Sequence, residues 1–323
     1  MAVYTEIADD DLAAFVASYD IGGLLSCKGI AEGVENSNYL LRTETNTYIL
    51  TLYEKRVDAG DLPFFLGLME HLSQQGLNCP LPVHDRAGNT LKTLAGRPAV
   101  LVTFLDGVWL HSPQIKHCAE LGGALAKLHQ AGKGFSIARA NALGVGGWRP
   151  LFNRFANEAD TIAPGLRDAI ARELDYLEAH WPCDLPLGVI HADLFPNNVF
   201  FLGDRLSGLI DFYFACNDAY AYDVAVCINA WCFDADHTFN LEKSRALLAA
   251  YNARRPLSAL ERAQLVILAR GAALRFLLTR AYDWINTPPG ALVTRHDPLE
   301  YRAKLQVFQR LTNASALGLD GHP

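Results

Sequence analysis

The sequence lacks the features that mark several broad classes of protein. Its 323 residues carry 28 lysines and arginines against 35 aspartates and glutamates, a formal net charge of −7, and no basic run. A nucleic-acid-binding protein normally carries a basic patch, so the charge balance argues against that class. The seven cysteines are scattered, odd in number and without a Cys-x-x-Cys pair. That distribution argues against a disulfide framework and fits a reducing cytoplasm.

Signals for targeting and for membrane insertion are also missing. The N-terminus has no basic stretch followed by an apolar run, so we expect no signal peptide. The most apolar helical stretch, residues 265–278, is interrupted by Arg270 and Arg275. It falls short of the roughly 20 apolar residues that a membrane span needs. We therefore expect a cytoplasmic protein that binds neither nucleic acid nor membrane, and the sequence does not indicate its oligomeric state.

The composition is that of a chain with a large core. Half of the residues are hydrophobic, one fifth are charged, and the mean hydropathy is +0.08. These values exclude a mainly disordered chain. A length of 323 residues suggests about two domains, at roughly 100–200 residues for each.

The first hundred residues predict a small β-rich domain. Runs of β-branched and aromatic residues at 39–43 and 48–53, joined by a polar turn, predict a hairpin. Residues 63–75 predict a helix, because apolar side chains recur there at helical spacing. Turns marked by glycine predict a second strand pair that ends near residue 102. The expected order is strand, strand, helix, strand, strand.

Beyond residue 104 the pattern becomes mainly helical. Helices are expected at 115–130, at 159–180 with a break, and from 218 to about 311, with short apolar strands between 187 and 210. We predict an α+β fold of two lobes. The small β-rich N-terminal lobe covers 1–104, and the larger, mostly helical C-terminal lobe covers 105–323.

One segment carries most of the chemistry. In Val189-Ile-His-Ala-Asp-Leu-Phe-Pro-Asn-Asn-Val, Asp193 and Asn198 lie five residues apart in a turn-prone stretch, and Asp211 ends a later apolar strand. Phosphoryl transfer needs a carboxylate that orients the attacking hydroxyl, and an amide oxygen with a second carboxylate to hold Mg²⁺. The spacing His-x-Asp-x4-Asn, followed by Asp-Phe, is that of the protein-kinase catalytic loop and its metal-binding aspartate. The pattern therefore favours phosphoryl transfer.

Two other interpretations of this segment stay open. A structural histidine and a capped loop would account for His191 and its neighbours without any chemistry. A metal hydrolase built on His191, Asp193 and Asp211 would need one more ligand, for which Asp218 and Asp223 are available.

The stretch from Gly29 to Tyr39 precedes the first hairpin strand and is rich in small and polar residues. Its backbone N–H groups could approach a phosphate. It is no Walker A loop, because the Gly-Lys-Ser/Thr ending is absent. Alone the stretch predicts a turn. In front of a β-rich lobe it is a candidate lid over a nucleotide, with Asn36 and Ser37 as candidate contacts.

These residues and several further segments resemble a known family. The chain resembles the aminoglycoside-phosphotransferase and choline-kinase-like superfamily of small-molecule kinases and, within it, the bacterial homoserine kinases. The resemblance covers nearly the whole chain. It is carried by residues 35–39, 48–54, 61–65, 189–215, 221–225 and 275–284.

The resemblance implies a bilobal protein-kinase-like fold that uses ATP and Mg²⁺. It implies transfer of the γ-phosphate to a primary alcohol, L-homoserine, as a step of threonine biosynthesis. By the resemblance Asp193 is the catalytic base, and Asn198 and Asp211 are magnesium ligands. The adenine would hydrogen-bond to the backbone of a hinge made of Val102, Thr103, Phe104 and Leu105.

The acceptor could be another small alcohol, such as an aminoglycoside, choline or hydroxylysine. An aminoglycoside needs many carboxylates and choline an aromatic cage, whereas an amino acid needs one cation and one acid. Arg275, Arg280 and Asp283 are the candidates for an amino acid; Arg280 and Asp283 share a helix face. Tyr220 and Trp231 could line the pocket. A catalytically inactive nucleotide-binding protein is a further alternative, but the predicted base and both metal ligands are present.

One position departs from the kinase pattern. Thr51 stands where the strand usually carries a lysine that contacts the α- and β-phosphates. The nearest cations, Lys55 and Arg56, lie beyond the strand, and Glu70 is the one acid in the following helix. The usual Lys–Glu pair is therefore not assigned to this chain.

Overall fold

The computed structural model describes residues 5–30, 36–54, 58–287 and 295–319, and the chain forms two compact units. The first unit is Met1–Asp106 with Gly208–Tyr213, and the second is Gly107–Ser207 with Phe214–Pro323. The sequence predicted one boundary, between 104 and 105. The chain instead crosses between the units three times, because the short segment that holds Asp211 belongs to the first unit.

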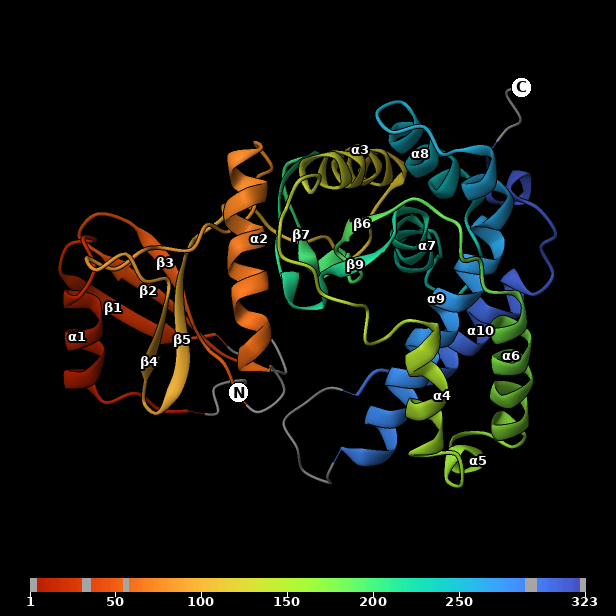
Figure 1. Cartoon of the computed structure of the whole chain (residues 1–323), viewed down its shortest axis with the longest axis horizontal. Helices are drawn as coiled ribbons and strands as arrows, with labels where there is room; N and C mark the ends of the chain where they lie inside the picture. Colours follow the sequence, from red (N-terminus) through yellow and green to blue (C-terminus); the bar gives the residue numbers. More distant parts are fainter. Residues whose placement is uncertain (1–4, 31–35, 55–57, 288–294, 320–323) are drawn as a thin grey trace. The chain divides into compact units, whose positions relative to one another are not determined.

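A five-stranded antiparallel sheet forms the centre of the first unit (Figure 1). Its order is β1-β2-β3-β5-β4. The strands are β1 (Leu24–Gly29), β2 (Ser37–Thr43), β3 (Thr47–Leu52), β4 (Leu91–Leu94) and β5 (Arg97–Thr103). Both predicted strand pairs are present, as β2–β3 and β4–β5. The edge strand β1 was not predicted, because its side chains are only half-buried or exposed and show no apolar alternation.

Two helices, α1 (Asp9–Ala17) and α2 (Leu62–Gln74), flank the sheet on opposite sides (Figure 1). Leu12 and Phe15 of α1 belong to one buried cluster with Leu50 and Leu101, which come from neighbouring central strands. The sequence predicted α2 but missed α1. A nine-residue helix that opens with three aspartates offers too short an apolar period to stand out.

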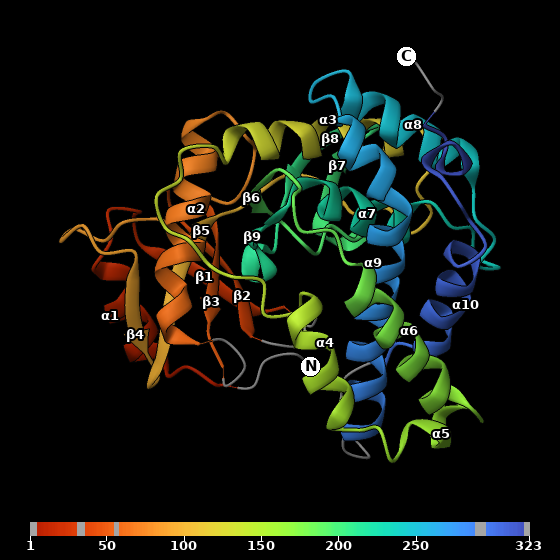
Figure 2. The same ribbon diagram turned by 45° about the vertical axis from the view of Figure 1, so that its right-hand side comes forward.

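The second unit is mainly helical (Figure 2). Its longest helix, α9, has 28 residues, starts with a capping box of Ser258 and Glu261, and packs against α4, α6, α7 and α10. The predicted helices are present. The structure adds α4, which was not predicted because two glycines and a proline interrupt its pattern. The helices are α3 (Ile115–Ala131), α4 (Val145–Asn153), α5 (Ala159–Ile162), α6 (Leu166–His180), α7 (Tyr220–Trp231), α8 (Leu241–Asn252), α9 (Ala259–Asn286) and α10 (Pro298–Phe308).

Four short strands make two small sheets. β6 (Leu187–Ile190) pairs antiparallel with β9 (Cys216–Ala219), and β7 (Val199–Leu202) pairs with β8 (Arg205–Leu209). The sequence predicted the first three in chain order but not β9, whose residues are half polar. Within the described ranges, no helix has the length and apolar character of a membrane span.

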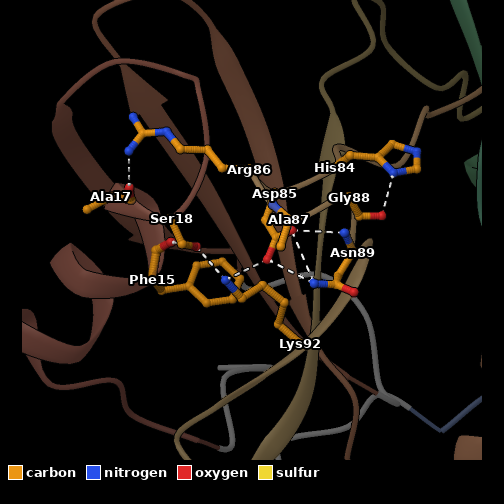
Figure 3. A network of polar contacts seen from close by, with 10 residues as sticks. All are labelled: Phe15, Ala17, Ser18, His84, Asp85, Arg86, Ala87, Gly88, Asn89 and Lys92. Atoms are coloured by element: carbon orange, nitrogen blue, oxygen red, sulfur yellow. Dashed lines mark hydrogen bonds and ion pairs between the residues drawn. The ribbon is translucent and has the colours of Figure 1, made fainter.

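A polar network ties α1 to the turn before β4 (Figure 3). The Asp85 carboxylate accepts hydrogen bonds from the backbone N–H groups of Ala87 at 2.9 Å and Asn89 at 2.8 Å. Lys92 pairs with Asp85 at 3.1 Å and also donates to the Ser18 hydroxyl, just beyond α1. The hydrogen bond from the Asn89 backbone, together with Lys92, lowers the pKa of Asp85 to about 2. The turn is therefore organised by one ionised carboxylate.

Candidate active site

The segment predicted to carry the chemistry forms a loop between β6 and β7. The Asn198 side-chain amide donates to the Asp193 backbone carbonyl at 2.8 Å and approaches Asp193 Oδ2 at 3.3 Å. The structure thus brings together these two predicted site residues. The side-chain nitrogen of Asn198 donates to Asp193, and an amide nitrogen does not bind metal ions. The side-chain oxygen, Oδ1, is therefore the atom of Asn198 that could bind a metal ion.

Asp223 of α7 holds the start of this loop. Its carboxylate accepts hydrogen bonds from the backbone N–H groups of His191 and Ala192, both at 2.8 Å, and from His129 Nε2 at 3.0 Å. The side chains of Asp223 and His129 are fully buried. Burial alone would raise the pKa of Asp223, but these donors keep that pKa below its usual value. The group is an ionised carboxylate used to fix the loop.

His129 extends this anchor into the helical core. Burial lowers the pKa of His129, so the ring is neutral; Nε2 donates to Asp223 and Nδ1 accepts from the Tyr251 hydroxyl at 2.8 Å. Arg255 in turn donates to the Tyr251 hydroxyl at 3.0 Å. A chain of hydrogen bonds therefore joins α3, α7 and α8 to the loop.

The loop backbone is held at two further carbonyl groups. Trp231 Nε1 donates to the Leu194 carbonyl at 2.7 Å, and the Arg275 guanidinium donates to the Ala192 carbonyl. Ala192 has a left-handed backbone, with φ of 63°. That conformation costs roughly 1–2 kcal/mol for a residue other than glycine, and such strain concentrates at functional sites.

Asp211 lies in the first unit, two residues after β8. Its φ is 64°, so this predicted site residue has a left-handed backbone, as Ala192 does. A backbone hydrogen bond attaches the segment to the first unit: the Leu209 N–H donates to the Asn78 carbonyl at 3.1 Å. The hydroxyl of Tyr53 donates to that of Tyr213 at 3.0 Å. The described contacts place Asp211 on a segment tied to the β-rich unit.

The predicted nucleotide contacts Asn36 and Ser37 lie at the start of β2. Asn36 Oδ1 accepts from the Glu54 backbone at 3.3 Å, and Ser37 Oγ donates to Glu54 Oε1 at 2.8 Å. Both side chains are buried and tie β2 to the end of β3. The rest of the candidate lid, residues 31–35, lies outside the described residues.

The predicted hinge begins at the end of β5. The Thr103 N–H donates to the Leu81 carbonyl at 2.9 Å, and the Phe104 N–H reaches the Thr47 carbonyl at 3.4 Å. The hinge residues are Val102, which is buried, Thr103 and Leu105, which are half-buried, and Phe104, which is exposed.

The position of the usual phosphate-binding lysine is occupied by a buried threonine. Thr51 Oγ1 donates to Asn38 Oδ1 at 2.8 Å across β3 and β2. Glu70 of α2 contacts His84 at 2.7 Å. Lys55 and Arg56 fall outside the described residues, so the structure adds no Lys–Glu pair.

The three predicted acceptor residues all lie in α9. Arg275 is only 3% exposed and faces Ala192 and Asp193 of the loop between β6 and β7. Arg280 pairs with Glu300 at 2.6 Å and lies 4.5 Å from the centre of the Tyr301 ring. Asp283 follows in the next turn and is half-buried.

The spare ligands of the metal-hydrolase alternative have other partners. In the part of the chain that the structure describes, no three His, Cys, Asp or Glu side chains are placed to share a metal ion. Of the spare ligands that it would use, Asp218 accepts from Asn141 at 2.7 Å and Asp223 is engaged by the loop.

Sequence analysis missed the anchors of the loop. Asp223 entered only as a possible metal ligand, and Trp231 only as a pocket wall. One signal existed for Asp223: it is the single charged residue in the mostly apolar helix α7, and a buried charge needs partners. His129 gave no such signal, because a histidine fits an amphipathic helix equally well.

The chain thus has a helical unit that carries this loop and a β-rich unit that carries Asp211. Residues 26–257 match the model of the phosphotransferase enzyme family, and the chain belongs to that family. It is 62% identical to a curated homoserine kinase of Rhodopseudomonas palustris over 321 residues, 99% of this chain and 98% of the relative. A homoserine kinase of Sinorhizobium fredii is 60% identical over 319 residues, with the same coverage of 99% and 98%.

Solved structures agree on the fold. The aminoglycoside phosphotransferase of Alicyclobacillus acidocaldarius aligns with a TM-score of 0.64 at 14% identity, covering 94% of this chain and 93% of that one. The predicted α+β, kinase-like fold and the predicted family are thereby confirmed, and the chain is an enzyme of the phosphotransferase class.

Proposed function

We propose that the enzyme transfers the γ-phosphate of ATP to the hydroxyl of L-homoserine, giving O-phospho-L-homoserine for threonine biosynthesis in the cytoplasm. The observation that carries this proposal is the 62% identity, over nearly the full length of both chains, with a curated homoserine kinase. The loop residues Asp193 and Asn198 and the separate Asp211 supply the side chains that the reaction needs.

Asp193 acts as the base. Its carboxylate orients the acceptor hydroxyl and takes the proton as the oxygen attacks the γ-phosphorus and ADP leaves. The contact from Asn198 to Asp193 Oδ2 and the anchored backbone on either side limit how far this carboxylate can turn. Pre-orientation of this kind lowers the entropic part of the barrier.

Asn198 and Asp211 would hold Mg²⁺. An amide oxygen and a carboxylate are hard oxygen ligands, which suit this ion. Bound Mg²⁺ supplies positive charge against the phosphates. The adenine would meet the hinge at Leu105, since the N–H groups of Thr103 and Phe104 are used within the first unit. Asn36 and Ser37, whose side chains are engaged, would offer backbone groups at the lid.

Arg280 and Asp283 are our candidates for the acceptor carboxylate and ammonium. A zwitterion removed from water needs both charges paired, because an unpaired buried charge costs several kcal/mol. These two residues carry opposite charges three positions apart on the helix that contacts the catalytic loop through Arg275. Arg275, predicted beside them, makes contacts that point to another task.

A panel of alcohols with MgATP, followed by ADP release, tests the function. We expect L-homoserine to be the best acceptor and choline and kanamycin to be inert. Serine, one methylene shorter, should react poorly, because a hydroxyl misplaced by ~1 Å can cost about 100-fold in rate. If choline or an aminoglycoside reacts faster than homoserine, that alcohol replaces homoserine as the proposed substrate.

Asp193→Asn serves as the control for that panel. Loss of a general base typically lowers turnover about 100-fold or more, and the near-isosteric change should leave folding and MgATP binding intact. A thermal-shift titration with MgATP checks the binding. Wild-type turnover in the variant would show that Asp193 is not the base.

A further inference from the structure

We propose that Arg275 is a positioning residue for the loop that carries Asp193, and that it does not clamp the acceptor carboxylate. This inference rests on the kinase function proposed above. It concerns how the predicted base is held, and it gives Arg275 a task that differs from the one its sequence position suggested.

The contacts of Arg275 point to the loop. Its side chain is 3% exposed, and Nη1 donates to the backbone carbonyl of Ala192. Nη2 lies 3.8 Å from Asp193 Oδ1, too far for a hydrogen bond but close enough for electrostatic attraction. The guanidinium thus touches the residue before the predicted base and attracts the base itself.

Two aromatic rings lie close to the guanidinium. Its central carbon lies 4.2 Å from the centre of the Phe276 ring and 5.4 Å from that of Phe214. Contacts of this type favour a cation that has left water. A guanidinium enclosed in this way has little surface left for a small zwitterionic acceptor.

Ala192 is held from both of its backbone polar groups. Asp223 of α7 accepts from its N–H at 2.8 Å, and Arg275 of α9 donates to its C=O. Two buried charges of opposite sign, on different helices, therefore stabilise the left-handed residue directly before Asp193. Without Arg275, the peptide that joins Ala192 to Asp193 would lose its donor and the strained backbone could relax.

The neighbouring arginines of α9 make different contacts. Arg270 forms a bidentate pair with Glu173, at 2.8 Å through both Nε and Nη2, and Arg280 pairs with Glu300. Neither has a described hydrogen bond or ion pair to residues 191–198. Arg270 is therefore a matched control, since it is a partly buried arginine on the same helix in a structural ion pair.

The test compares Arg275→Met and Arg275→Lys with Arg270→Met in the full-length enzyme. We expect Arg275→Met to lower kcat by about 10- to 100-fold, with the KM values for homoserine and ATP within about twofold of wild type. Arg275→Lys keeps a charge but lacks the planar fork, so it should recover only part of kcat. Arg270→Met should lower thermal stability and leave kcat unchanged.

Amide hydrogen exchange gives a readout that needs no acceptor. A peptide covering residues 189–199 should exchange faster in both Arg275 variants than in Arg270→Met. If Arg275→Met does not fold, Arg275→Lys carries both measurements.

The outcomes separate the competing tasks. A raised KM for homoserine at unchanged kcat would show that Arg275 binds the acceptor carboxylate and would overturn the proposal. Unchanged exchange and unchanged kcat in a folded variant would overturn it as well. The wild-type enzyme could fail to phosphorylate homoserine while residues 189–199 still exchange faster in the Arg275 variants than in Arg270→Met. In that case the proposed function is wrong, but the role of Arg275 in positioning the loop is supported.

Discussion

Each unit contains a carboxylate that organises a turn by accepting backbone hydrogen bonds. The two carboxylates differ in how many residues separate them from their donors. In the first unit Asp85 binds the N–H groups of Ala87 and Asn89, two and four residues later. In the second unit Asp223 binds the N–H groups of His191 and Ala192, 32 and 31 residues earlier. The backbone donors to Asp85 lie within its own turn, whereas those to Asp223 lie in a distant loop that packs against its helix.

The two turns also differ at their left-handed residue. The turn of Asp85 places a glycine there, Gly88 with φ of 85°, and glycine adopts this conformation without strain. The catalytic loop places Ala192 there with φ of 63°. The backbone of Gly88 carries no strain that a partner must offset, although Lys92 ties this turn to Ser18, whereas the strained loop persists because Asp223 and Arg275 hold it. The comparison predicts that damage to the first turn stays local and that damage to the second reaches catalysis.

The largest effect is expected from Asp223→Asn. The change leaves donors from His191, Ala192 and His129 around an amide that carries no charge, and buried donors without an ionised acceptor are costly. We expect the free energy of unfolding to fall by about 3 kcal/mol and kcat to fall at least about tenfold. Urea unfolding and steady-state kinetics measure both. Asp85→Asn is the control, and we expect its kcat to stay within about twofold of wild type. A wild-type kcat in Asp223→Asn would show that catalysis does not depend on the anchor of the loop.

Gly88→Ala tests the local turn. A Cβ at this position would meet no atom within 4 Å, so the cost comes from the backbone conformation alone. We expect the free energy of unfolding to fall by about 1–2 kcal/mol, with kcat unchanged. A clear loss of activity in this variant would show that the first turn is not self-contained.

Ala192→Gly is the reciprocal change and should have a smaller effect on stability. Relief of the left-handed strain and the greater entropy of the unfolded glycine oppose each other, so we expect a net change within about 1 kcal/mol. The loosened backbone should lower kcat a few-fold. Denaturant unfolding decides this prediction, and a stability loss as large as that of Gly88→Ala would contradict it.

The smallest effect concerns acid. The Asn89 backbone donor and Lys92 lower the pKa of Asp85 to about 2, from an ordinary value of 3.8. A lowered pKa means that the folded state prefers the ionised form, so this stabilisation is complete above pH 3.8 and is lost as the pH falls towards 2. The melting temperatures of wild type and Asp85→Asn should therefore converge over this window. A constant difference between them would show that Asp85 does not titrate in the way its contacts predict.

Local patterns made much of the fold predictable. The β2–β3 hairpin, α2, α3 and the strand before the catalytic loop follow from apolar periodicity and turn residues, which act over a few positions. The elements that were missed, such as β1 and α4, have partial burial or helix-breaking residues. Their structure depends on partners elsewhere in the same unit, which periodicity does not reveal.

The candidate site divides in the same way. The sequence by itself indicated the chemistry, because Asp193, Asn198 and the later Asp211 are the residue types, at the spacing, that the phosphoryl-transfer pattern has. Only the tertiary structure decided how the predicted base is held. Asp223 lies about 30 residues from the backbone groups that it binds, and Arg275 lies 83 residues from Ala192. Contacts over such separations leave no period or spacing in the chain, since they arise only when packed helices bring a buried charge to a loop that needs it.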